Sequence, residues 1–546
     1  MPTKTVIQNT LKSLNIIDWC DVFSSMTLIV GIIYSPFFFT VGLIMMLVRV
    51  LFIGNMKEKI KKLKQSYKIL LCLLGIYLLN IVGMLWSSNL QYGLFELNHK
   101  MPFLVLPLFC LVISPIKKQF WQVLLFAYIV AITIGVAIGL INYFIDPYAD
   151  GRFLVPTARN ISFAFHLCFA ISVMTIAAYK NKEVRKFLTP IIILFTVYIF
   201  VASLISGIVT LIILMIFALI SIIRKKRKSY SIIAISICAI ALVLCGVWLS
   251  KQIDNYFTPK QEFALYIKEK TALGNDYIPF DNKFIENGYY VYMYSCPSEV
   301  ESAWKQRTGL NLTDYCTDNE GLQYYKYNDI IYRYLNSKGL KKDASGVAAL
   351  TDKDIENIKK GYANVVYAER FSLRPRLYQT FFEFEHYLRS GEVREMSVIQ
   401  RYFWSKNAIN IIKQHILIGC GTGDTRDELT APIMGKHPEL CTTGCNPHNQ
   451  FLYTFAAFGL LGIMIMLIYI LYLPIKLRLF KNLYFCVFFI IAICWMFAES
   501  SFESFEGMTF ISALMSAFCY NDYFLEQKKK INNQKESLSS TFNANL

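Results

Sequence analysis

Long uncharged apolar runs recur along this chain of 546 residues, and they constrain its fold more than any other feature. A helix crosses the hydrocarbon core of a bilayer with about 20 mainly apolar residues. The clear runs cover about 67–86, 101–114, 119–143, 158–178, 230–250, 450–473, 481–498 and 505–524. They predict an all-α integral membrane protein.

Two further runs, 22–53 and 187–223, are too long for one ordinary helix. Each contains a breaker, Ser35-Pro36 in the first and Ser203 to Gly207 in the second. Lys and Arg collect in cytoplasmic loops, and splitting both runs places every basic cluster on one side of the membrane. This predicts about 12 transmembrane helices with both termini in the cytoplasm. The basic clusters are Lys57 to Lys68, Lys117-Lys118, Lys180 to Lys186, Arg224 to Lys228, Lys476 to Lys481 and Lys528 to Lys535.

The composition excludes several classes of protein. Hydrophobic residues make up 55% of the chain and charged residues only 17%, against about 25% charged in soluble proteins. A soluble enzyme and a fibrous protein are therefore excluded. The net charge of +17 does not indicate nucleic-acid binding, because the basic residues are divided among short clusters between apolar runs.

The predicted spans divide the chain into four parts. Residues 1–250 form an N-terminal membrane domain of about nine helices, and residues 447–525 form a C-terminal membrane domain of three helices. Between them, residues 251–446 are rich in Tyr, Asp, Glu, Lys and Asn and have helical periodicity, which predicts a mainly helical periplasmic loop domain. Residues 526–546 are expected to be a disordered cytoplasmic tail.

Five of the 14 Cys lie in this insert. Because a compartment outside the cytoplasm permits disulfides, Cys296–Cys316 and Cys441–Cys445 are possible pairs. A zinc site is the weaker interpretation, since no CxxC or HxxxH spacing accompanies these residues. We therefore expect no zinc site among these cysteines.

His448 is the strongest candidate for a catalytic base among the six His of the chain. It lies in Asn446-Pro447-His448-Asn449-Gln450, at the expected outer end of a membrane helix. Imidazole titrates near neutral pH, so a His at an aqueous boundary can take a proton from a sugar hydroxyl. The alternative is that His448 only caps or anchors its helix.

Four strings in order resemble the signature of the O-antigen ligase and polymerase superfamily. They are Arg401-Tyr402-Phe403-Trp404, then Gly419-Cys420-Gly421-Thr422-Gly423-Asp424, then Pro447-His448-Asn449-Gln450 followed by Phe458-Gly459-Leu460-Leu461-Gly462. The resemblance implies a multi-helix glycosyltransferase of the bacterial inner membrane with one large periplasmic loop. It implies a glycan donor on undecaprenyl pyrophosphate and transfer without metal or nucleotide, to lipid A–core, to another lipid-linked chain or to a protein hydroxyl.

The leaving pyrophosphate is best held by the bidentate forks of arginine. The resemblance favours Arg401, Arg159 before the sixth predicted helix and, less directly, Arg376 as substrate-binding residues, with Asn449 orienting the substrate. One departure weakens this set: many family members carry a Ser-Arg pair where this chain has Ser206-Gly207. Arg152, Arg376 or Lys100 are candidates to replace that arginine.

Other functions remain open at this stage. Ligation to lipid A–core, polymerisation of repeat units and protein O-glycosylation share donor and base and differ only in the acceptor. A flippase or another transporter is the alternative from a different class, because such proteins also have about a dozen helices. Transporters usually carry polar or broken helices at the midplane, whereas the candidate residues here collect at one predicted face.

Overall fold

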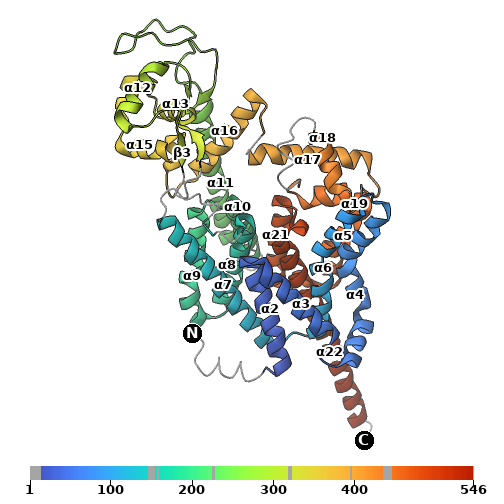
Figure 1. The fold of residues 1–546 in the computed structure, drawn as a ribbon. Helices are drawn as coiled ribbons and strands as arrows, with labels where there is room; N and C mark the ends of the chain where they lie inside the picture. Colours follow the sequence, from blue (N-terminus) through green and yellow to red (C-terminus); the bar gives the residue numbers. More distant parts are fainter. Residues whose placement is uncertain are drawn as a thin grey trace. The chain divides into compact units, whose positions relative to one another are not determined.

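The computed structural model describes residues 14–145, 154–155, 159–223, 228–317, 323–393, 396–434 and 446–544. The chain forms two compact units. Unit 1 contains Met1–Ile145, Gly151–Met215 and Gln400–Leu546, and unit 2 contains Asp146–Asp150 and Ile216–Ile399. Helices dominate both units (Figure 1).

Unit 1 is built from helices alone within the described residues. Its elements are α2 (Ile16–Tyr34), α3 (Pro36–Leu51), α4 (Met56–Gly83), η1 (Met84–Trp86), α5 (Leu90–His99), α6 (Pro102–Ile113), α7 (Lys118–Ile145), α8 (Asn160–Lys180), α9 (Lys182–Val201), most of α10 (Ile205–Ile223), α17 (Ser397–Gln414), α18 (Thr425–Met434), α19 (Gln450–Leu467), η5 (Ile468–Tyr472), α20 (Leu473–Lys476), η6 (Leu479–Lys481), α21 (Leu483–Ala498), η7 (Ser501–Glu503) and α22 (Phe505–Ala544).

Among the described residues, seven helical segments are long and apolar enough to cross a membrane. They are Ile16–Tyr34, Met56–Trp86, Leu90–Ile113, Lys118–Ile145, Asn160–Lys180, Lys182–Val201 and Gln450–Lys476. Shorter apolar helices cover Pro36–Leu51, Ile205–Ser221 and Leu483–Ala498, and the predicted spans 230–250 and 505–524 lie within α11 (Lys228–Phe257) and α22. The structure agrees with a helical membrane protein, while the count of twelve spans stays a prediction.

Both long apolar runs are broken where the sequence predicts a break. α2 ends at Tyr34 and α3 begins at Pro36, which is tolerated in a first helical turn because its missing N–H would have no partner there. The two helices then pack closely: a Cβ on Gly42 would lie 2.8 Å from the Leu28 nitrogen. In the second run, Ser203 takes a φ of 50° between α9 and α10.

Unit 2 combines helices with two short antiparallel hairpins. Beside α11, its elements are β1 (Ile285–Glu286), β2 (Tyr289–Tyr290), α12 (Pro297–Thr308), β3 (Tyr315–Thr317), β4 (Gln323–Lys326), α13 (Tyr327–Ser337), α14 (Ala344–Ala348), α15 (Asp352–Lys359), η3 (Val365–Ala368) and α16 (Arg374–Ser390).

Trp304 and Tyr334 are fully buried in the apolar core of unit 2. The Arg333 guanidinium forms a bidentate ion pair with the buried Glu286, at 2.8 and 3.0 Å.

The predicted insert 251–446 is mainly helical where it is described, but it is divided: Gln400 and the residues after it belong with unit 1.

The possible disulfide between Cys296 and Cys316 is not formed, because both residues are free cysteines. Both are buried, and the Cys316 thiol donates to the Ile358 carbonyl at 3.5 Å. They pack as small apolar side chains, which is the common role of a buried Cys. Cys441 and Cys445 lie outside the described residues.

Candidate functional site

The turn between α21 and α22 carries the carboxylates around which the site in unit 1 is built. We call Phe497–Glu506 the acidic connector; its acidic residues are Glu499, Glu503 and Glu506. α21 ends at Ala498 and the apolar α22 begins at Phe505, so these charges fall between two apolar helices. Side chains from α17, α19 and the loop before it, α8 and the α5–α6 junction all contact this segment.

His448 lies two residues before the start of α19 and faces the acidic connector. Its Nδ1 lies 2.7 Å from Glu499 Oε2, and its backbone N–H donates to Asn446 Oδ1 at 2.9 Å. Its φ of 50° lies in the left-handed region, and this conformation directs the chain into α19. Because an ionised carboxylate can only accept, Nδ1 is the protonated nitrogen and Nε2 carries the lone pair in the neutral ring.

Arg401 reaches the same carboxylate from α17. Its Nη2 donates to Glu499 Oε1 at 2.8 Å, and its Nη1 donates to the Ala498 carbonyl at 3.2 Å. About a third of its side chain stays exposed, as does 29% of the His448 side chain. Glu499 therefore holds an imidazole on one oxygen and a guanidinium on the other, at a surface that a ligand can reach.

Asn449 is the N-cap of α19. Its Oδ1 accepts from the Leu452 N–H at 3.1 Å, which satisfies one of the unpaired donors of the first turn. Its Nδ2 donates to the Phe497 carbonyl at 3.5 Å. Asn449 thus lies beside His448 and ties α19 to the acidic connector.

Lys100 also contacts the acidic connector, but it is buried. Its ammonium donates to the Phe502 carbonyl at 2.7 Å, forms an ion pair with Glu503 and lies 3.6 Å from Glu96 Oε2. Burial raises the pKa of Glu503 against the opposing effect of Lys100. With only 2% of Lys100 exposed, this geometry favours a structural ion pair over the pyrophosphate contact that the sequence predicts.

Arg159 is the N-cap residue of α8, and its Nε lies 3.7 Å from Glu506 Oε1. Its side chain is 68% exposed, so most of its hydrogen-bonding capacity faces outward. The acidic connector therefore contacts five of the predicted residues: His448, Asn449, Arg401, Lys100 and Arg159.

The other predicted ligands are not brought to this cluster by any contact described within unit 1. Arg376 belongs to unit 2, where its Nη1 donates to Gln379 Oε1 on α16 at 3.1 Å. Arg152 lies outside the described residues. At Gly207, where the resemblance predicts an arginine, an added Cβ would lie 3.2 Å from Ala164 Cβ and 3.3 Å from Ile199 Cγ2.

The glycine-rich string forms a tight turn against α19. Cys420 N–H and Gly421 N–H donate to the carbonyls of Ala456 and Ala457, at 3.1 and 2.8 Å. The Leu460 N–H donates in return to the Ile416 carbonyl at 2.8 Å, which is possible because α19 is non-helical at Gly459. The two glycine strings of the motif therefore bind each other through their backbones.

The same turn reaches the first membrane helices. The Asp424 carboxylate accepts from the N–H groups of Ser88, at 2.8 and 3.0 Å, and of Asn89, at 2.7 Å. The Thr422 hydroxyl donates to the Asn80 carbonyl of α4 at 2.7 Å. These contacts fix the glycine-rich string to α4 and to the residues before α5.

No sequence motif described above includes Glu499. The signal that could have identified it is a carboxylate between two long apolar runs, since ionisable residues at such places are often functional. Its partners Arg401 and His448 are 98 and 51 residues away. No local pattern connects residues at these separations.

Models of known protein families give no match to the chain, and a comparison with curated proteins finds none.

Proposed function

We propose that this protein is a glycosyltransferase that moves a glycan from undecaprenyl pyrophosphate to an acceptor hydroxyl, in the ligation of O-antigen to lipid A–core. The observation that supports it best is the arrangement of His448 on Glu499 beside Arg401. A carboxylate on Nδ1 leaves Nε2 as a base, which is what activation of a hydroxyl requires.

In this proposal His448 Nε2 accepts the proton of the acceptor hydroxyl. The hydroxyl oxygen forms a bond to C1 of the donor sugar while the bond from C1 to the pyrophosphate oxygen breaks, and the electron pair leaves with the pyrophosphate. A single displacement of this kind inverts the configuration at C1. Glu499 stabilises the imidazolium that results, because its carboxylate lies 2.7 Å from Nδ1.

Arg401 and Arg159 are the proposed ligands of the departing pyrophosphate. Both are partly exposed, and a guanidinium can share its remaining donors with phosphate oxygens in a fork. Arg376 stays a predicted ligand. Lys100 is left out of this set, because its ammonium is buried against Glu503 and the Phe502 carbonyl.

The proposed location is the bacterial inner membrane, with about twelve spans, both termini in the cytoplasm and residues 251–446 in the periplasm. The proposed partners are the lipid-linked glycan, lipid A–core or another glycan or protein acceptor, and membrane lipid. No metal and no cofactor enters the proposed reaction.

The decisive test is transfer by His448→Ala in a reconstituted assay with purified undecaprenyl-pyrophosphate glycan and acceptor. Loss of a general base typically costs 10²–10⁴-fold in rate, and we expect a loss of about that size with normal expression. His415→Ala, at an exposed position after α17, is the matched control and should keep wild-type activity. Substantial turnover by His448→Ala would refute the base assignment.

The acceptor is identified by lipopolysaccharide gel profiles of a deletion strain. Loss of all long chains from lipid A–core with accumulation of lipid-linked polymer indicates a ligase, and a ladder reduced to one repeat indicates a polymerase. Movement of intact lipid-linked glycan across vesicles without covalent transfer would indicate a flippase.

In the reconstituted assay, transfer should persist in EDTA.

A further inference from the structure

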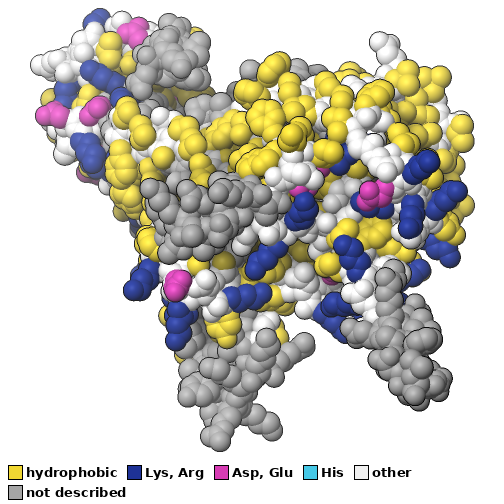
Figure 2. Space-filling model, turned by 90° about the horizontal axis from the view of Figure 1, so that it is seen from below, with side chains coloured by type: hydrophobic (Ala, Val, Ile, Leu, Met, Phe, Trp, Pro, Cys, Tyr) yellow, Lys and Arg dark blue, Asp and Glu magenta, His cyan; other side chains and the backbone are white. Residues whose placement is uncertain are grey.

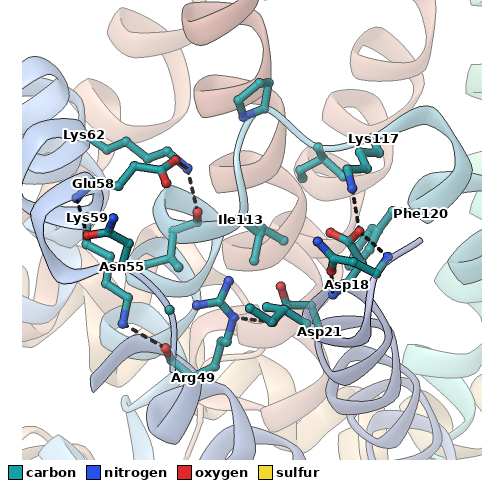
Figure 3. Close-up of a pocket in the computed structure, with 16 residues that line it drawn as sticks. Asp18, Asp21, Arg49, Asn55, Glu58, Lys59, Lys62, Ile113, Lys117 and Phe120 are labelled. Atoms are coloured by element: carbon teal, nitrogen blue, oxygen red, sulfur yellow. Dashed lines mark hydrogen bonds and ion pairs between the residues drawn. The ribbon is translucent and has the colours of Figure 1, made fainter. Parts of the chain in front are cut away.

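A charged cavity of about 330 Å³ opens in unit 1 between the start of α2, the end of α3 and the start of α4. Figure 3 shows side chains from these three helices and from the α6–α7 loop directed toward one space. Its ionisable lining residues are Asp18, Asp21, Arg49, Glu58, Lys59, Lys62 and Lys117. Nothing in the proposed reaction uses them.

The cavity lies at the opposite end of unit 1 from His448. α4 begins at the cavity with Glu58 and Lys59 and ends beside the glycine-rich turn, where Thr422 binds Asn80. Its 28 residues span roughly 40 Å, at about 1.5 Å per residue. α22 connects the same two ends in the opposite direction, since it begins next to the acidic connector and its Asn521 accepts from the Ile116 N–H at the cavity. The two sites therefore lie at opposite ends of unit 1, and a bilayer spanned by these helices would separate them.

Positive charge exceeds negative charge in the cavity by one. Arg49 pairs with Asp21 at 2.7 Å, Lys62 with Glu58 at 3.3 Å and Lys117 with Asp18. Lys59 has no carboxylate within ion-pair distance among the described residues, and its ammonium donates to the carbonyls of Arg49 and Val50 at 3.1 and 2.6 Å. A cation held only by neutral carbonyls attracts an anion into this space.

The surroundings of the cavity also suit a lipid. Ile16 is 83% exposed at the start of α2, and Phe52 is 77% exposed just after α3. Figure 2, which views the lower end of Figure 1, shows basic side chains scattered over this face among apolar ones, with few acidic side chains. Basic pockets between transmembrane helices, bordered by apolar surface, bind the headgroups of anionic lipids.

We propose that this cavity binds the phosphate headgroup of an anionic phospholipid, with its acyl chains against the exposed apolar side chains of α2 and α3. In this proposal, Lys59, Lys62 and Arg49 contact the phosphate group. The inference does not depend on the proposed glycosyl transfer, because it concerns the other end of unit 1.

The test measures lipid retention by native mass spectrometry on the full-length protein, delipidated in detergent and titrated with phosphatidylglycerol, phosphatidylethanolamine or inorganic phosphate. We expect the wild type to prefer phosphatidylglycerol. Lys59→Gln combined with Lys62→Gln should weaken its binding about tenfold or more, since each Lys near an anionic surface contributes about 1 kcal/mol.

The matched control is Lys61→Gln combined with Lys64→Gln, which removes the same charge from exposed positions of the same helix. The control should bind like the wild type. Equal weakening in both double variants would show a long-range charge effect and overturn the site. Equal retention of the two lipids, or competition by inorganic phosphate at the lipid's own concentration, would overturn the lipid as the ligand.

Discussion

At the scale of single residues, the candidate site depends on one carboxylate with two partners. Glu499 accepts from the Arg401 guanidinium on Oε1 and faces His448 Nδ1 with Oε2. The carboxylate sets the tautomer of the imidazole and also holds Arg401, the proposed pyrophosphate ligand. A change at Glu499 should therefore alter the base, whereas a change at Arg401 should alter substrate binding.

Glu499→Gln is the test of this positioning role. The amide can present its N–H₂ group to Nδ1, which would place the ring proton on Nε2 and remove the base. We expect transfer to fall by about 100-fold or more, as in other His sites that lose their orienting carboxylate. The measurement is the pH profile of kcat/KM for the activity that remains. If Glu499 had a purely structural role, this profile would have the same shape as that of the wild type.

Glu526→Gln, at an exposed position on α22, is the control for this experiment and should keep both rate and profile. A wild-type profile for Glu499→Gln would leave Glu499 with no role beyond its ion pairs.

Arg401→Lys and Arg159→Lys test the arginine forks. Each keeps the charge and loses the bidentate geometry, so we expect the proteins to remain in the membrane and to lose most transfer. Arg185→Lys, on the exposed start of α9, should transfer at the wild-type rate. If both forks can be replaced by Lys without loss, pyrophosphate is bound elsewhere.

The residues of the site could be predicted only in part. His448 and Arg401 are in strings with a recognisable order, and the structure brings both to Glu499. The charge and expected outer position of Lys100 predict a substrate contact. The sequence does not show that its ammonium forms an ion pair with Glu503, 403 residues away. Pairings of this kind depend on which helix ends meet, and that is decided by the tertiary fold.

At the scale of elements, the glycine-rich turn and α19 depend on each other. At Gly459, φ is 59° and ψ is −151°, a conformation that glycine adopts readily and other residues rarely. A Cβ at this position would lie 2.4 Å from the Leu417 carbonyl carbon. The local break in α19 thus makes room for the segment that ends α17.

Gly459→Ala should destabilise the protein by roughly 2–5 kcal/mol, from backbone strain together with overpacking. The measurement is the midpoint of thermal unfolding in detergent. Gly246→Ala in α11 is the control, because within the described part of the chain its added Cβ would meet no atom within 4 Å beyond its own stretch of helix, and Ala favours a helix. A midpoint for Gly459→Ala equal to that of the control would contradict the packing described above.

Element boundaries were more predictable than contacts between elements. The break at Ser35-Pro36 follows from the proline itself and appears as the boundary of α2 and α3. The break in α19 was not predicted, because Gly459 sits in an otherwise continuous apolar run. It is understood only from the backbone of Ile416 to Ile418, which approaches it from another part of the chain.

At the scale of the whole molecule, the twelve-span topology is the main prediction still to be tested. Reporter fusions at residues 60, 183, 226 and 478 should report the cytoplasm, and fusions at 150, 300 and 500 the periplasm. The expectation follows from the basic clusters beside the first set. A periplasmic signal at 226 with a cytoplasmic signal at 300 would refute the division of 187–223 into two spans.

The acidic connector has a consequence for how the chain matures during synthesis. His448 and Arg401 leave the ribosome before their partner Glu499. Asp424 contacts Ser88, which is 336 residues away in the sequence. Contacts this distant in sequence form late, so nearly the whole chain must be translated and inserted before the site exists. A product that stops before the acidic connector would leave Lys100 without Glu503 and Arg159 without Glu506, giving quality-control proteases an incompletely assembled bundle to remove.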